Sequence, residues 1–197
     1  MCKLKSAIIL KNRVFVPEYD SHTKMLEELG IKDDYLNASK TFVRVELSPA
    51  DGDMFSDIDT WEFSVDQDIM PEWYDEDIYK PHVVEAVKEW AKDHIHIGVD
   101  GLKIATGINH YIKDCKDIRI YGSATVNYIC GSATVKNAKG ISVIIGSEYG
   151  WNKKETLILA ENATFKDCQT RTIYQSGDWK LVSVESKNKI EKENQNE

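Results

Sequence analysis

The pentapeptide GSATV occupies residues 122–126 and returns nine residues later, at residues 131–135. A related pentapeptide, GISVI, follows at the same spacing at residues 140–144, and ENATF at residues 161–165 is a weaker copy. Repeats with a glycine at the turn, followed by small and branched apolar residues, are typical of short stacked β-strands. The pattern predicts a β-repeat module. Two interpretations stay open: a short solenoid, or an antiparallel meander whose hairpins have similar sequences.

The residues that precede these repeats follow a different pattern. Two apolar runs around a polar turn predict a β-hairpin over residues 7–16, and a capping serine with a glycine stop predicts a helix over residues 21–30. Alternating residues predict strands at 41–47 and 61–65. Apolar residues at steps of three and four then predict an amphipathic helix whose first turn contains Pro81.

Together these patterns predict an α+β chain with two modules. We expect a small N-terminal α/β sandwich domain over residues 1–100, with an acidic loop at residues 51–77. A short β-repeat module, solenoid-like or a meander, is expected over residues 101–185. The remaining residues, 186–197, are almost all polar and cannot bury enough apolar surface to order themselves, so they predict a disordered tail.

Charge is distributed unevenly along the chain. Residues 51–79 contain eleven carboxylates and no Lys, Arg or His, with Trp61, Phe63, Trp73 and Tyr74 among them. Because the whole chain carries a formal charge of −8, the residues outside this block sum to +3. The acidity is therefore local, and a local negative surface suits a basic partner. The low pI, about 5.2, argues against direct binding of nucleic-acid phosphates.

The predicted partner-binding surface combines acidic side chains, which steer association, with aromatic side chains, which supply desolvated contact area. The carboxylate of Glu72 belongs to the same run of charge. The residues predicted to bind the partner are Asp51, Asp53, Asp57, Asp59, Glu62, Asp66, Asp68, Trp73, Tyr74, Asp75, Glu76 and Asp77.

No catalytic residue, metal ligand or cofactor is predicted. Residues 51–62 place carboxylates at calcium-loop spacing, but they lack the turn glycine and the flanking helices of that motif. His94 and His96 would share one face of a strand, yet no third His or Cys lies near them. Asp66 and Asp68 are the kind of carboxylate pair that glycosidases use, although among so many acids some pair is inevitable.

The cellular setting is expected to be the cytoplasm. The N-terminal apolar run is too short for a signal peptide, and no stretch approaches the roughly 20 apolar residues of a membrane span. In a reducing compartment the cysteines, which form no CxxC pair, are expected to be buried free thiols. They are Cys2, Cys115, Cys130 and Cys168.

Four blocks of the N-terminal half resemble a group of uncharacterised proteins from gut bacteria and their phages. The blocks are FVRVEL at 42–47, WEFSVDQD at 61–68, PEWY at 71–74 and AVKEW at 86–90, and the resemblance extends over residues 6–97. Members of the group often carry a variable C-terminal module rich in short Ser, Thr and Val repeats. The resemblance implies a phage or mobile-element setting and brings no activity or functional residue with it.

These observations favour a non-enzymatic binding protein whose acidic, aromatic face docks on a basic groove of another protein. A nucleic-acid-binding enzyme such as a host defence nuclease fits this description, since carboxylates can imitate a phosphate ladder in the manner of an anti-CRISPR DNA mimic. One alternative is a structural module that forms homo-oligomers through the β-repeats. A second is a carbohydrate-binding protein or hydrolase that stacks sugars on Trp61 and Trp73.

Overall fold

The computed structural model describes residues 4–139, 143–146, 157–159, 163–167, 172–175 and 182–183. It combines helices with several β-sheets, as the predicted α+β class requires. The chain divides into two compact units, Met1–Ile95 and His96–Glu197, so the first unit ends five residues before the predicted boundary. The predicted tail at residues 186–197 lies outside the described residues.

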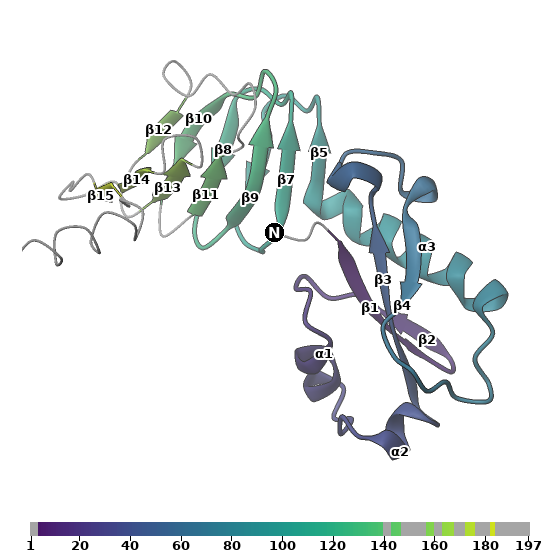
Figure 1. Ribbon diagram of the computed structural model, residues 1–197. Helices are drawn as coiled ribbons and strands as arrows, with labels where there is room; N and C mark the ends of the chain where they lie inside the picture. Colours follow the sequence, from purple (N-terminus) through teal and green to yellow (C-terminus); the bar gives the residue numbers. More distant parts are fainter. Residues whose placement is uncertain are drawn as a thin grey trace, which may run out of the picture. The chain divides into compact units, whose positions relative to one another are not determined.

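The first unit is built on a four-stranded antiparallel sheet with the order β2-β1-β3-β4 (Figure 1). Two apolar runs and a polar turn form the predicted hairpin. The strand predicted at 41–47 is β3, which begins and ends one residue later than predicted. The last strand, β4, lies at an open edge of the sheet. The strands are β1 (Lys5–Leu10), β2 (Arg13–Phe15), β3 (Phe42–Ser48) and β4 (Glu62–Val65).

Helices cover both faces of this sheet. The register pairs Val45 with Ala7 and with Val65, so all three side chains share one face, which α3 (Glu76–His94) covers (Figure 1). Glu46 and its strand neighbours Phe42 and Arg44 point to the opposite face. There Ile8 and Phe42 pack with the short helices α1 (His22–Glu28) and α2 (Tyr35–Ala38), through Met25, Leu26 and Ala38.

The ends of the helices follow capping chemistry. Ser21 caps α1 as predicted, because its side chain accepts a hydrogen bond from the Lys24 N–H, and Gly30 has the positive φ, 68°, of a C-terminal stop. The placement of Pro81 in a first turn was wrong. Asp75 caps α3, which begins at Glu76, so Pro81 is the sixth residue of the helix.

From β5 to β13 the strands of the second unit alternate between two sheets as the chain advances, and β14 and β15 then join the larger sheet (Figure 1). The larger sheet contains β5 (Ile95–Ile97), β7 (His110–Lys113), β9 (Thr125–Cys130), β11 (Val143–Gly146), β13 (Thr164–Asp167), β14 (Thr172–Gln175) and β15 (Val182–Ser183). The smaller sheet contains β6 (Lys103–Ile104), β8 (Ile118–Ile120), β10 (Val135–Ala138) and β12 (Leu157–Leu159).

The described pairs from β6 to β13 are parallel, and only β13, β14 and β15 pair antiparallel. A meander predicts antiparallel pairs throughout, so that interpretation fits the last three strands alone. Ile118 pairs with Val135, seventeen residues later, and both are fully buried. Between the sheets lies a core of small and branched residues: Ile104, Ile112, Cys115, Ile118, Ile120, Ala124, Val126, Ile129, Ala133, Val135, Ala138, Ile144, Ala163 and Phe165.

The two GSATV copies lie at successive turns of this second unit. Gly122 and Gly131 have positive φ values of 55° and 65°, and the copies lead into β9 and β10, which belong to different sheets. The nine-residue repeat therefore spans one strand and its turn, and two such segments return the chain to the same sheet. The start of the third copy, at Gly140, lies outside the described residues.

Candidate functional site

The acidic block spans the open edge of the first unit. It runs from the end of β3 through two short 3-10 helices, η1 (Ala50–Gly52) and η2 (Ile58–Thr60), then along β4 to the first turn of α3. All eleven carboxylate residues are exposed: Asp51, Asp53, Asp57, Asp59, Glu62, Asp66, Asp68, Glu72, Asp75, Glu76 and Asp77.

Three of these carboxylates fix the local backbone. Asp53, Asp57 and Asp75 each accept a hydrogen bond from the N–H two residues later, over distances of 3.0, 3.1 and 3.0 Å. Such Asx turns satisfy backbone donors that begin a turn or a helix. The carboxylates of Asp53 and Asp57, at two of the calcium-loop positions, are thus turned toward their own backbone.

Two further carboxylates form ion pairs. Asp59 lies 2.7 Å from the Lys88 ammonium of α3, and Asp66 lies 3.1 Å from Nδ1 of His22. Within the part of the chain that the structure describes, the side chains of the other six make no hydrogen bond or ion pair. These six are Asp51, Glu62, Asp68, Glu72, Glu76 and Asp77.

The aromatic residues of the block are packed to different extents. Trp61 is only 4% exposed and belongs to the core. Trp73 and Tyr74 are half-buried: the Trp73 indole N–H donates to the Lys40 carbonyl at 2.7 Å, and the Tyr74 ring stacks on Tyr79. Burial, followed by the nearby charges of Glu76 and Asp75, raises the pKa of Tyr74 to about 12. Trp73 and Tyr74 therefore hold the loop before α3 in place and keep part of their surface exposed.

A second polar cluster, which sequence reasoning missed, lies on the α1 face of the sheet. Its members are His22, the first residue of α1, Glu46 of β3, and Asp66, which directly follows β4. Each offers one ligand atom, and the three atoms lie within 4.8 Å of one another. Because Glu46 pairs with Ser64, the side chains of Glu46 and Asp66 are diagonal neighbours on one face of the sheet.

The hydrogen bonds of His22 define its tautomer. Nε2 lies 3.2 Å from the Val45 carbonyl oxygen, which only accepts, so Nε2 carries the proton and donates. Nδ1 then faces the Asp66 carboxylate at 3.1 Å. With the proton on Nε2, a neutral imidazole has its lone pair on Nδ1, and this lone pair faces the Asp66 carboxylate.

Glu46 sits in a less solvated position than Asp66. Burial, reinforced by the charge of Asp66 and opposed by His22, raises the pKa of Glu46. The guanidinium of Arg44, which lies on the same face of β3, forms its ion pair with Asp33. Among the described residues, no hydrogen bond or ion pair holds the Glu46 carboxylate.

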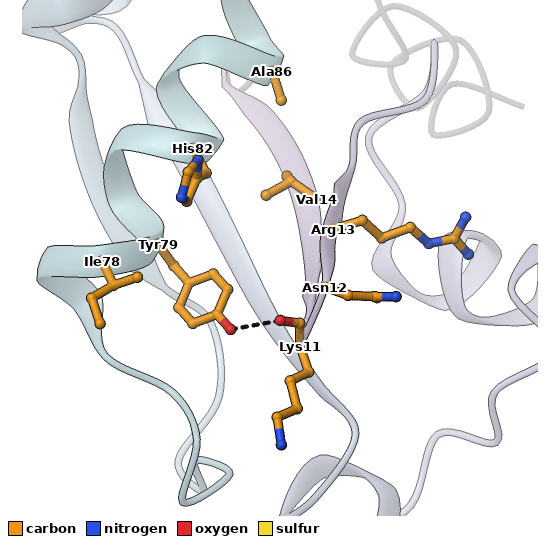
Figure 2. A pocket seen from close by; sticks show the side chains of 8 residues that line it. All are labelled: Lys11, Asn12, Arg13, Val14, Ile78, Tyr79, His82 and Ala86. Atoms are coloured by element: carbon orange, nitrogen blue, oxygen red, sulfur yellow. Dashed lines mark hydrogen bonds between the residues drawn. The ribbon is translucent and has the colours of Figure 1, made fainter.

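A shallow hollow separates β2 from the first half of α3 (Figure 2). Its volume is about 400 Å³, and Val14, Ile78 and Ala86 supply apolar walls. Tyr79 bridges the two sides, because its hydroxyl donates to the Lys11 carbonyl oxygen at 2.8 Å. The Arg13 side chain points away from α3 in Figure 2, so its charge is not directed into the hollow.

Other histidines and cysteines considered in the sequence analysis pack within the fold. His94 ends α3, with Nδ1 2.8 Å from the Trp90 carbonyl oxygen, whereas His96 belongs to the second unit and stacks on His110. They do not share a strand face. Cys115 is buried, burial raises the pKa of its thiol, and Cys168 lies outside the described residues.

Comparison of the chain with protein-family models, with curated proteins and with solved structures found no match. Among the helices of the described residues, none has the length and apolar character to cross a membrane.

Proposed function

We propose that the first unit is a binding module whose acidic block recognises a basic surface of another protein. The observation that carries the proposal is the exposure of all eleven carboxylates along one continuous segment that contains no Lys, Arg or His. A surface with this excess of negative charge raises the association rate with a positively charged partner and imposes a strong salt dependence.

The carboxylates divide into two functional groups in this proposal. Those that cap turns or pair with Lys88 and His22 shape the segment. The six without a side-chain partner keep their charge available for recognition. Trp73 and Tyr74 keep the loop before α3 rigid, which lowers the entropy lost on binding, and offer their exposed surface as contact area.

The partner class that we propose is a nucleic-acid-binding protein, whose channel concentrates Lys and Arg. A phage or mobile-element setting, with a host defence nuclease as the target, extends this proposal and is supported by the charge of the block and the resemblance described above.

The test compares two variants that each remove three negative charges. The block variant carries Asp51→Asn, Asp68→Asn and Glu72→Gln. The control variant carries Glu27→Gln, Asp93→Asn and Asp100→Asn, which neutralise exposed carboxylates outside the block. Association with a panel of DNA-binding proteins is measured at about 0.1 M and about 1 M salt, where the screening length falls from about 10 to about 3 Å.

We expect the block variant to associate about tenfold more slowly at low salt, and the control variant to associate within about twofold of the wild-type rate. DNA added as a competitor should displace the protein. If the association rate fell equally in both variants, the block would act only as general surface charge. Binding that does not weaken between about 0.1 M and about 1 M salt would contradict the proposal.

For the second unit we propose a short β-solenoid. The proposal is supported by the parallel pairs between β6 and β13, the alternation of strands between two sheets, and the apolar core between them. Outer strands of such a stack offer unpaired edges, which favours a second role in self-association. Light scattering tests this role: a defined oligomer that survives charge neutralisation supports it, and a monomer across the accessible concentrations excludes it.

A further inference from the structure

The cluster of His22, Glu46 and Asp66 has the composition of a metal site with three protein ligands. One imidazole and two carboxylates come from α1, β3 and the end of β4, so three separate elements converge on one point. Three protein ligands leave other coordination positions for water or substrate, as in many solvent-accessible metal centres. Asp66 is 58% exposed and also lines a hollow of about 440 Å³, so this ligand faces solvent.

The orientation of His22 is the second observation. A histidine that binds a metal through one ring nitrogen usually donates a hydrogen bond from the other, often to a backbone carbonyl. His22 has this arrangement, because Nε2 donates to the Val45 carbonyl oxygen and leaves the Nδ1 lone pair directed at the cluster. The side chain is only 11% exposed, so the ring orientation is held by packing as well as by this bond.

The distance between His22 and Asp66 is that of two ligands on one ion. Two atoms about 2.1 Å from one metal ion, at a right angle to each other, lie about 3 Å apart. Nδ1 of His22 and Oδ2 of Asp66 are 3.1 Å apart. A cation shared by these atoms removes the repulsion between two acceptors and also neutralises the neighbouring Glu46 carboxylate.

We propose that His22, Glu46 and Asp66 bind one divalent transition-metal ion on the α1 face of the first unit. Imidazole favours ions such as Zn²⁺, Fe²⁺ and Co²⁺, and the two carboxylates extend this preference to Mn²⁺. The site is distinct from partner recognition, because only Asp66 belongs to the acidic block.

The experiment titrates the full chain with Mn²⁺ at about pH 7.5, where an ordinary histidine is neutral, and counts the unbound ion by electron paramagnetic resonance. Mn²⁺ is the appropriate probe because it prefers oxygen and nitrogen ligands over the thiols of this chain. We expect one bound ion per chain and a melting temperature that rises with Mn²⁺ concentration.

Glu46→Gln and His22→Gln each remove one ligand and should weaken Mn²⁺ binding by about tenfold or more. Asp68→Asn is the matched control: it removes one charge from the same loop, two residues from Asp66, and should bind within about twofold of the wild type. Circular dichroism checks folding, and the nearly isosteric Glu46→Gln keeps the test decisive if His22→Gln unfolds.

Two results would overturn the site. The first is the absence of Mn²⁺ binding by the wild type, which leaves the three side chains as a hydrogen-bonded cluster without a metal. The second is undiminished binding by both Glu46→Gln and His22→Gln, which assigns the ion to other surface carboxylates. Neither result bears on partner recognition, since both variants leave the acidic block intact.

Discussion

The two units of this protein use polar side chains in opposite ways. In the second unit the polar contacts join one turn to the next: Asp114 accepts from the Ser132 N–H at 2.8 Å, and the Asp117 N–H donates to the Thr134 hydroxyl at 3.0 Å. In the first unit, polar side chains from distant segments gather on one face of a sheet. The contrast shows that contacts between neighbouring turns maintain an architecture, whereas side chains that converge from distant segments identify a candidate site.

The largest expected effect tests the repeated core. Ile118→Ala removes a fully buried side chain between the sheets of the second unit and should lower the free energy of unfolding by about 2–5 kcal/mol. His22→Gln in the first unit disturbs one hydrogen bond and one ion pair without emptying a core, and should lower it by about 1 kcal/mol. Urea unfolding followed by circular dichroism measures both. If both variants lost the same free energy of unfolding, the proposed difference between the repeated core and the His22 cluster would be wrong.

A smaller effect concerns the turns that stack in the second unit. Gly131 has a φ of 65°, and a Cβ there would overlap the Asp114 carboxylate, which its bonds to Ser132 hold in place. Gly131→Ala should therefore destabilise by about 2–3 kcal/mol, as strain and lost hydrogen bonds add.

Gly101→Ala is the matched control for this turn. Gly101 has a similar φ of 73°, but nothing lies within 4 Å of the added Cβ, so only the backbone strain of about 1 kcal/mol remains. Thermal unfolding of the two variants gives the difference. If both lose the same stability, the stacking of Asp114 on Gly131 contributes nothing.

The smallest expected effect is a pH dependence of stability in the first unit, which arises from Lys5. Its side chain is fully buried and donates to Asp20 at 2.6 Å and to the Tyr19 carbonyl oxygen at 3.1 Å. Burial lowers the pKa of Lys5 below 10.5, and Asp20 only partly opposes this. The unfolded chain therefore binds this proton more tightly than the folded chain does. The free energy of unfolding consequently increases as the pH rises toward 10.5.

Lys5→Met lacks this titration. The unfolding free energy of the wild type minus that of Lys5→Met should rise as the pH is raised from neutral toward 10.5. Urea unfolding of both proteins over this range measures the difference, in which the contributions of the other lysines cancel. If this difference stayed constant with pH, the pKa of Lys5 would be the same in the folded and unfolded chains, contrary to the prediction.

Much of the first unit could be predicted from local patterns. The alternation around Val43 and Val45 located β3 to within one residue because one face of the strand is buried by α3. The start of α3 was missed because its capping residue, Asp75, belongs to the acidic block and was interpreted only as surface charge. Pro81 is tolerated inside the helix near its start, and α2 is too short to show a helical period.

The cluster on the α1 face could not be predicted by spacing. His22, Glu46 and Asp66 are separated by twenty residues or more, and their meeting depends on the register of β3 with β4 and on where α1 begins. In the second unit the repeat indicated short strands correctly, but its period did not reveal that alternate strands join different sheets. Periodicity describes neighbours along the chain, whereas these features depend on partners in space.

The parallel register of β8 and β10 has a consequence for how the gene can change. Ile118 and Val135 are seventeen residues apart along the chain and directly paired in space. Removal or duplication of one whole turn, about seventeen codons here, keeps each later strand in its own sheet, whereas a gain or loss of eight or nine codons exchanges one sheet for the other. Evolution can therefore adjust the length of this half in steps of one strand spacing, about 4.8 Å, without redesigning its interior.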